Sequence, residues 1–291
     1  MGCISSNLFR SSQSVNSRIS TEAKINDNSA PTSQQRPAIN QSCQDMRSPV
    51  LSENLKDTYY ERQLIEAKFI NAIKKDDAVE LKAMFDKKEV SNHDNLGDNM
   101  LTAVHRAVRH SPKTLQLLID YGYDVNTASK DGQLTTPLHL AVISTNITTL
   151  NILLESGKTN INFVNSDGLN SLHMTSFKKF NEGAELLLKH GADPNIDMPT
   201  GTSMLTASIA TYNSELAKLL VKYGSDVNHN QQFLTPLVTA CAKENVELVS
   251  LLLDNGADLN APEGTKAPLQ IARMLQNQGI IDLLENSISD E

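Results

Sequence analysis

The first six residues carry the clearest chemical pattern in the sequence. They read MGCISS, so that Gly2 follows the initiator methionine and a serine stands at position six. Removal of Met1 exposes the α-amine of Gly2, and a glycine there leaves an N-myristoyltransferase room to reach that amine. Cys3 places a thiol beside the first acyl chain, within reach of membrane-bound palmitoyltransferases. The pattern therefore predicts lipidation of Gly2 and Cys3 in a cell that contains these enzymes.

A stable anchor needs a second attachment, because a myristoyl chain alone gives marginal, reversible membrane binding. Residues 1–56 contain six Lys or Arg and four Asp or Glu, a net charge of +2, which is too small for a polybasic signal. Cys3 must then supply the second attachment, and Cys43 is a weaker candidate because it lies far from the first chain. The leader resembles the dual-acylation leaders of Src-type kinases, some G-protein α subunits and several acylated pathogen effectors.

Little other catalytic or metal-binding chemistry is visible in the sequence. The three cysteines form no pair at zinc spacing that could complete a site with histidines, and the glycine-rich nucleotide motifs and the H-E-x-x-H metalloprotease motif are absent. The net charge of −8 argues against a general nucleic-acid binder, which needs a basic face. We therefore expect no enzyme, no metal, no cofactor and no small-molecule substrate.

Signals for secretion or membrane insertion are also missing. No run of 18 apolar residues occurs, and no apolar stretch follows Met1 as in a cleaved secretory signal. Three cysteines cannot form a disulfide framework. These features predict an intracellular chain whose contact with membranes depends on acylation.

Residues 7–56 differ in composition from the remainder of the chain. They are dense in Ser, Asn and Gln, contain Pro31, Pro37 and Pro49, and show no sustained apolar period. Such a segment cannot bury enough apolar surface to offset its conformational entropy. We expect residues 1–56 to form an acylated, disordered membrane tether, which would reach roughly 40 Å on average if it behaves as a flexible chain.

From about residue 94 the sequence repeats with a period of 32 to 34 residues. The sequence TPLHLA at 136–141 is the clearest copy of a six-residue marker, with further copies at 102–107, 170–175, 203–208, 235–240 and 267–272. A leucine-rich segment follows each of the first five copies and ends at a glycine, and an Asp/Asn-x-Asn triplet follows that glycine. Because three markers keep phase over at least five copies, the repeat is a structural unit.

The unit resembles the ankyrin repeat, whose period is near 33 residues and whose marker is T-P-L-H-x-A. The resemblance covers about residues 94–288. It implies an all-α fold, an ankyrin repeat solenoid of stacked helix-turn-helix units with β-hairpin fingers. The marker residues fit this fold, since Thr136 and Thr235 stand where they can cap a helix and Pro137 and Pro236 occupy the first helical position.

The elements that position these markers extend to both ends of the chain. Residues 57–93 read as two amphipathic helices without a T-P-L-H marker, which predicts an N-terminal capping helical hairpin. Residues 94–291 then hold about six ankyrin repeats, of which the last is a cap. The resemblance implies that His105, His139 and His173 bond backbone and the adjacent cap residue. Ligands on successive repeats lie too far apart to share one metal ion.

Partner-binding residues follow from the phase of the repeat. In ankyrin repeats generally, partners contact the finger tips and the concave row of first helices. The concave-row candidates are Arg109, His110, Ile143, Ser144, Phe177, Lys178, Thr211 and Lys243. The finger candidates are Gln133, Thr135, Asp167, Leu169, Thr200, Thr202, Gln232 and Leu234. Phe177 and Phe180 flank two lysines, which is the composition of an interface anchor, although packing against the neighbouring repeat explains Phe177 equally well.

These patterns favour a membrane-tethered ankyrin repeat scaffold or adaptor that holds a protein partner at the cytosolic face of the plasma membrane. Three alternatives stay open. The chain could be a bacterial effector delivered into a eukaryotic cell and acylated at a host membrane, a regulatory or inhibitory subunit of an enzyme, or a soluble ankyrin protein with an idle N-terminus. The partner cannot be read from the sequence, because one fold binds many unrelated targets.

Overall fold

The computed structural model describes residues 49–91, 101–229, 234–260 and 267–289. The chain divides after Ser52, and the fold described here is that of the part from Glu53 onward. Gly2, Cys3 and Cys43 lie outside the described residues, so lipidation at these positions stays a prediction. No helix among the described residues combines the length and the hydropathy needed to cross a membrane.

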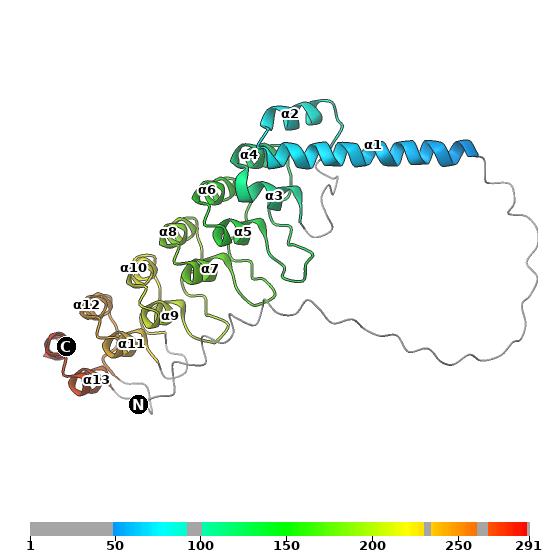
Figure 1. Cartoon of the computed structure of the whole chain (residues 1–291). Helices are drawn as coiled ribbons and strands as arrows, with labels where there is room; N and C mark the ends of the chain where they lie inside the picture. The colour runs from blue at the N-terminus through cyan, green and yellow to red at the C-terminus, as the bar shows by residue number, and fades with distance from the viewer. Residues whose placement is uncertain (1–48, 92–100, 230–233, 261–266, 290–291) are drawn as a thin grey trace, which may run out of the picture. The chain divides into compact units, whose positions relative to one another are not determined.

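The described residues form fourteen α-helices, of which all but the first lie in two rows (Figure 1). One row holds the first helix of each repeat: α3 (Ala103–His110), α5 (Pro137–Ile143), α7 (Ser171–Lys178), α9 (Met204–Ala210), α11 (Pro236–Ala242) and α13 (Pro268–Leu275). The other row begins with α2 and holds the second helices: α2 (Ala78–Asp86), α4 (Pro112–Asp120), α6 (Ile147–Glu155), α8 (Asn181–Lys189), α10 (Ser214–Lys222), α12 (Val246–Asp254) and α14 (Gln278–Ser289).

Packing runs both within and between the two rows. Each first helix packs against the second helix of its own repeat, and the second helices pack on one another in order from α2 to α14. In the first row, α3, α5 and α7 pack in sequence, as do α9, α11 and α13. The described residues therefore form an all-α stack of helix-turn-helix units, which confirms the predicted fold class.

Helix α1 (Pro49–Lys74) begins earlier than the sequence suggested. The tether was expected to end near residue 56, whereas the helix starts at Pro49. A proline is compatible with the first turn of a helix, because the N–H it lacks would have no partner there. The C-terminal part of α1 supplies Phe69, Ala72 and Ile73 to the core.

The fingers between repeats are turns rather than extended hairpins. One backbone hydrogen bond closes each of three of them: Ser129 N to Thr135 O at 2.8 Å, Asn165 N to Leu169 O at 2.9 Å, and Met198 N to Thr202 O at 2.9 Å. No described residue belongs to a strand longer than an isolated bridge, such as the antiparallel pair Asp197 and Ser203. The expected β-hairpin fingers are thus too short to form a ladder.

The T-P-L-H marker works as a reciprocal cap at the start of the first helix. In the second repeat, the hydroxyl of Thr136 accepts from the backbone N–H of His139 at 3.4 Å, and the N–H of Thr136 donates to His139 Nδ1 at 3.2 Å. The same arrangement holds for Thr102 with His105 and for Asn170 with His173. These bonds satisfy donors that would otherwise lack partners at the helix N-terminus.

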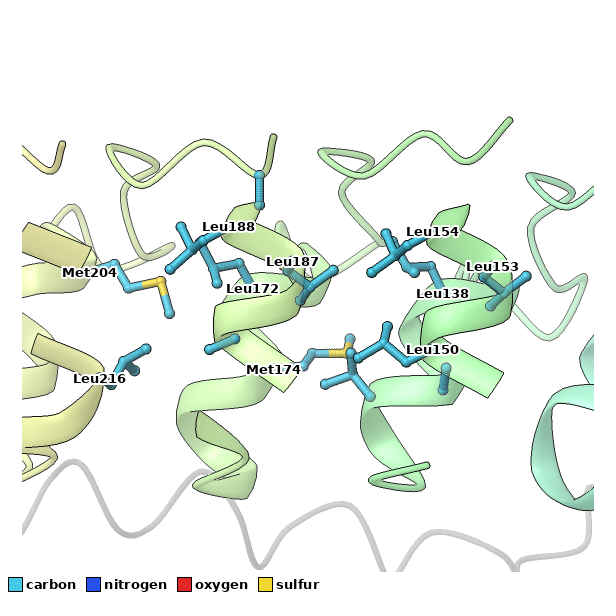
Figure 2. Packing of buried hydrophobic residues seen from close by; sticks show 14 of the residues in the cluster. Leu138, Leu150, Leu153, Leu154, Leu172, Met174, Leu187, Leu188, Met204 and Leu216 are labelled. Atoms are coloured by element: carbon cyan, nitrogen blue, oxygen red, sulfur yellow. The ribbon is translucent and has the colours of Figure 1, made fainter. Parts of the chain in front are cut away.

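The core is a continuous series of apolar contacts along the stack. Figure 2 shows leucine and methionine side chains of α5 to α10 lying in this series between successive repeats. Leu153 and Leu187 occupy equivalent positions in α6 and α8 and are fully buried. Because a single helix pair cannot bury its own apolar face, each repeat is stabilised chiefly by its neighbours.

Candidate protein-binding surface

The turn between the two helices of a repeat has the same backbone form throughout most of the stack. Together with the last residues of the first helices, these turns form a surface that we call the turn row, made of residues 109–110, 143–145, 177–179, 211–212, 243–244 and 275–276. In five turns one residue adopts a left-handed conformation with φ between 50° and 59°: Thr145, Lys179, Tyr212, Glu244 and Gln276. In the second repeat this residue closes the first helix, since Thr145 N donates to Val142 O at 2.9 Å and Asn146 N to Ala141 O at 3.0 Å.

An asparagine usually follows the left-handed residue and ties one turn to the previous one. Its side-chain oxygen caps the second helix at Asn146, Asn213 and Asn245. Its amide nitrogen reaches the preceding repeat: Asn146 Nδ2 donates to Arg109 O at 3.2 Å, Asn213 Nδ2 to Asn181 Oδ1 at 3.0 Å, and Asn245 Nδ2 to Ser214 Oγ at 3.0 Å. Consecutive turns are therefore fixed side by side.

The concave-row candidates lie in this row and are accessible. Arg109, His110, Ile143, Ser144, Phe177, Lys178 and Thr211 are exposed, and Lys243 is half-buried. The Nζ atom of Lys243 lies 4.4 Å from the ring centroid of Tyr212, which explains its partial burial. The structure thus brings the eight predicted residues onto the turn row, and their role in partner binding stays a prediction.

The two aromatic residues around Lys178 and Lys179 have different roles. Phe177 is 61% exposed, so packing between repeats does not account for it. Phe180 is half-buried and lies against Gly183 in α8. Tyr212, which the sequence analysis missed, is 70% exposed and lies one turn further along. It could have been found from the phase of the repeat, because it directly follows the candidate Thr211.

The finger candidates are divided between accessible and structural positions. Gln133, Asp167, Thr200 and Leu234 are exposed, Thr135, Leu169 and Thr202 are half-buried, and Gln232 lies outside the described residues. The carbonyl of Thr135 lies 2.8 Å from His105 Nε2, and that of Leu169 lies 3.1 Å from His139 Nε2. These two finger residues therefore hold one repeat to the next, which confirms the implied role of His105 and His139.

A second asparagine ladder joins the bases of the fingers and was also missed. In the Asp-x-Asn triplets, Asp226 Oδ1 accepts from Asn228 N at 2.9 Å. The side chain of Asn228 then bridges to the next repeat, where Nδ2 donates to Gly256 O at 2.9 Å and Oδ1 accepts from Asp258 N at 2.7 Å. The triplet therefore both turns the chain and connects neighbouring repeats.

The side chains of the three marker histidines are buried. Burial lowers the pKa of His105, His139 and His173 below the usual value, and for His105 and His139 a hydrogen bond to a backbone carbonyl offsets only part of this effect. His173 differs from the other two, because its Nε2 atom has no hydrogen-bond partner. A histidine confined in this way is suited to structure rather than to proton transfer.

Metal-ligating clusters and reactive cysteines can be sought among the described residues by their geometry and burial. No group of three or more His, Cys, Asp and Glu in the described ranges could hold a metal ion. Cys241 is fully buried, and burial raises the pKa of its thiol to about 12, which disfavours a nucleophilic thiolate. An open groove between α12 and α14 is lined by Glu247, Leu251 and Asp282 but contains no histidine, cysteine or lysine.

The stack of helix pairs matches a known repeat family. A family model described as ankyrin repeats in three copies matches residues 69–165, 104–198 and 203–290. The chain belongs to the ankyrin repeat family. Ankyrin repeats are scaffolds for protein–protein interaction, so the exposed row of turns belongs to a fold built to bind other proteins.

Several named proteins share the ankyrin region. The chain is 31% identical over 146 residues to the B-cell lymphoma 3 protein homolog of Mus musculus, covering 48% of this chain and 32% of that protein. It is 32% identical over 144 residues to the nuclear factor NF-kappa-B p105 subunit of Gallus gallus, covering 48% of this chain and 14% of that protein. The chain thus spans a third or less of the length of these relatives, and the similarity concerns their repeats.

Two solved ankyrin domains have the same fold. The ankyrin repeat domain of Bcl-3, described as a unique member of the IkappaB protein family, matches with a TM-score of 0.63 and 24% identity over 75% of this chain and 97% of that one. The ankyrin repeat domain of human ASB11 matches with a TM-score of 0.52 and 23% identity over 75% of this chain and 96% of that one. At this level of identity the likeness shows the fold alone.

Proposed function

We propose that this ankyrin repeat protein is a membrane-tethered scaffold that binds a protein partner through its turn row. Acylation of Gly2 and Cys3 would hold it at the cytosolic face of a membrane, with the plasma membrane the expected site. A partner bound to a tethered scaffold reaches a higher effective concentration at that membrane without any new contact.

The exposure of Phe177 and Tyr212 is the observation that best supports partner binding at the turn row. Large aromatic side chains in a stacked repeat are normally buried between repeats, yet Phe177 and Tyr212 are 61% and 70% exposed in adjacent repeats. Aromatic residues are enriched at protein interfaces, and tyrosine is among the residues that most often dominate binding energy there. The anchoring part of the proposal is supported by the MGCISS leader, whose pattern fits acylation at Gly2 and Cys3.

Membrane fractionation with azido-myristate labelling in eukaryotic cells tests the anchor. Wild type should be labelled and sediment with membranes, Gly2→Ala should be unlabelled and cytosolic, and Cys3→Ser should give weak, exchanging association. Unlabelled, cytosolic wild type would refute the tethered reading. If Gly2→Ala stays at the membrane, the anchor lies elsewhere in the chain.

The binding part of the proposal is tested by proximity labelling in the same cells. Phe177→Ala with Tyr212→Ala should remove the set of proteins labelled by wild type, while the melting curve of the purified variant stays close to that of wild type. The matched control is Val79→Ala with Val164→Ala, which truncates two exposed apolar side chains outside the turn row. An unchanged set of labelled proteins in the turn-row variant would refute binding at this surface.

A further inference from the structure

The turn row has the opposite charge to the rest of the chain. It contains four cations and one carboxylate, a net charge of +3, whereas the whole chain carries −8. The charged residues of the row are Arg109, Lys178, Lys179, Lys243 and Glu244. A local charge that opposes the overall charge marks a surface suited to a partner of complementary charge.

Lys243 lies over the Tyr212 ring, and the other three cations, Arg109, Lys178 and Lys179, form no ion pair in the part of the chain that the structure describes. The second-helix row differs, because Lys218 Nζ lies 2.8 Å from Glu247 Oε1 and Lys222 Nζ lies 2.9 Å from Glu185 Oε1. The turn row thus keeps its cations available, while the opposite row pairs several of its own.

Charged and apolar side chains alternate along the turn row. In order, the row presents Arg109 with His110, then Ile143, then Phe177 with Lys178 and Lys179, then Tyr212, then Lys243 with Glu244, and finally Leu275. Lys243 lies over the Tyr212 ring, so that one cation and one aromatic face form a joint contact. The row therefore offers apolar positions separated by cationic ones.

The spacing of the turns limits the conformation of a partner. Packed helices lie roughly 8–10 Å apart, and an extended chain advances about 3.3–3.6 Å per residue. A segment that runs along the row in an extended form would therefore meet a new turn about every third residue. Crossing all six turns takes roughly 12–15 residues.

Resting on the proposed function, we infer that the partner of the turn row is an extended acidic segment of another protein, in which Asp or Glu and large apolar residues alternate about every third position. Carboxylates would pair with Arg109, Lys178 and Lys179, and apolar side chains would cover Phe177 and Tyr212. The chain's own N-terminal segment is a poor occupant, because residues 1–56 carry a net charge of +2. Anionic lipid is disfavoured as well, since a lipid-binding basic patch clusters four to eight Lys or Arg, whereas the four cations of this row are spread over three turns and one of them stands beside Glu244.

An unbiased peptide selection tests this inference without knowledge of the natural partner. The probe is a displayed library of random peptides about 16 residues long, long enough to cross the row. The full chain with Gly2→Ala is the bait, so that acylation plays no part. Selected peptides should be rich in Asp and Glu, poor in Lys and Arg, and carry an aromatic or large aliphatic residue about three positions from an acidic one.

Charge reversal then locates the binding. Lys178→Glu with Lys179→Glu should weaken a selected peptide by about tenfold or more, and added salt should weaken it further. Lys113→Glu with Lys189→Glu makes the same change in net charge at exposed positions of the second-helix row and should alter the affinity by less than about twofold. An equal loss of peptide affinity in both variants would overturn the inference. So would a selection in which the Lys178→Glu, Lys179→Glu bait enriches acidic peptides as strongly as the bait without these changes.

Other outcomes identify other occupants and also overturn it. Neutral peptides that bind wild type but not Phe177→Ala with Tyr212→Ala would keep the proposed binding surface and refute its acidic partner. Sedimentation of the unacylated chain with phosphatidylserine vesicles, lost in the Lys178→Glu, Lys179→Glu variant, would point to a membrane. Tighter peptide binding after deletion of residues 1–48 would show that the chain's own N-terminal segment occupies the row. Concentration-dependent dimerisation that is lost in the Lys178→Glu, Lys179→Glu variant would show that a second copy of the chain occupies it.

Discussion

The ring of Phe180 lies against Gly183 and fills the space that a Cβ atom at that glycine would need. Phe180 is the N-cap residue of α8 and makes no side-chain cap bond. The corresponding residues Asn146, Asn213 and Asn245 cap their helices through side-chain oxygens. In the third repeat, an aromatic contact has therefore replaced a polar cap.

Gly183→Ala should destabilise the protein by about 1–3 kcal/mol, because the added methyl group displaces the Phe180 ring. Helix propensity alone predicts a gain of about 1 kcal/mol for the same change, so the sign of the effect decides between the two. Urea unfolding followed by circular dichroism measures it. Gly279→Ala in α14 is the control, since the nearest atoms to a Cβ there lie at 3.6 Å or more, and this change should be neutral or slightly stabilising. A stabilising Gly183→Ala would contradict the contact.

The sequence predicts those features that depend on local spacing. The cap at Thr136, the proline at position 137 and the phase of the repeat depend on residues close together in the chain, and all are found in the structure. The sequence could not predict which of Phe177 and Phe180 is exposed, because the two residues are close together in the chain. Phe180 is the one that packs, because its ring fills the space beside Gly183. The links made by Asn228 were missed for a similar reason, since its partners lie about thirty residues away.

Asn228→Ala should destabilise the stack by about 1–3 kcal/mol, because it removes two hydrogen bonds between successive repeats. Thermal and urea unfolding of the purified variant measure the change. Asn260→Ala is the matched control, because Asn260 occupies the same place in its triplet but its side chain bonds only to Asp258 of the same repeat among the described residues. The ladder would be unimportant to stability if the two variants unfold alike.

Leu187→Ala should be strongly destabilising, by roughly 2–5 kcal/mol, as is typical of a leucine removed from a packed core. Leu187 is fully buried in α8, among the leucines drawn in Figure 2. Leu186→Ala removes the same atoms from a half-buried neighbour and should cost clearly less. A cost for Leu187→Ala below about 1 kcal/mol would be inconsistent with its position between repeats.

The buried histidines should make the stability of the fold depend on pH. Desolvation lowers the pKa of His105, His139 and His173 from the ordinary value of 6.5. The unfolded chain therefore binds protons that the folded chain excludes once the pH falls below about 6.5. Stability from this source is fully present above that pH and is lost as the pH falls toward the folded-state pKa values.

His139→Gln should reduce this pH dependence, because it removes one of the three groups that the fold holds neutral. We expect the free energy of unfolding of wild type to fall between pH 7.5 and 5.5, with a slope of up to about 1.4 kcal/mol per pH unit for each buried histidine. Urea unfolding across this range should give a smaller slope for His139→Gln, and the same substitution at exposed His110 serves as the control. The difference in the free energy of unfolding between wild type and His139→Gln should also be smaller at pH 5.5 than at pH 7.5. At pH 5.5 the wild-type protein has already lost part of the stability that the neutral ring of His139 contributes. Equal slopes for wild type and His139→Gln would mean that His139 is protonated in the folded state as readily as in the unfolded chain.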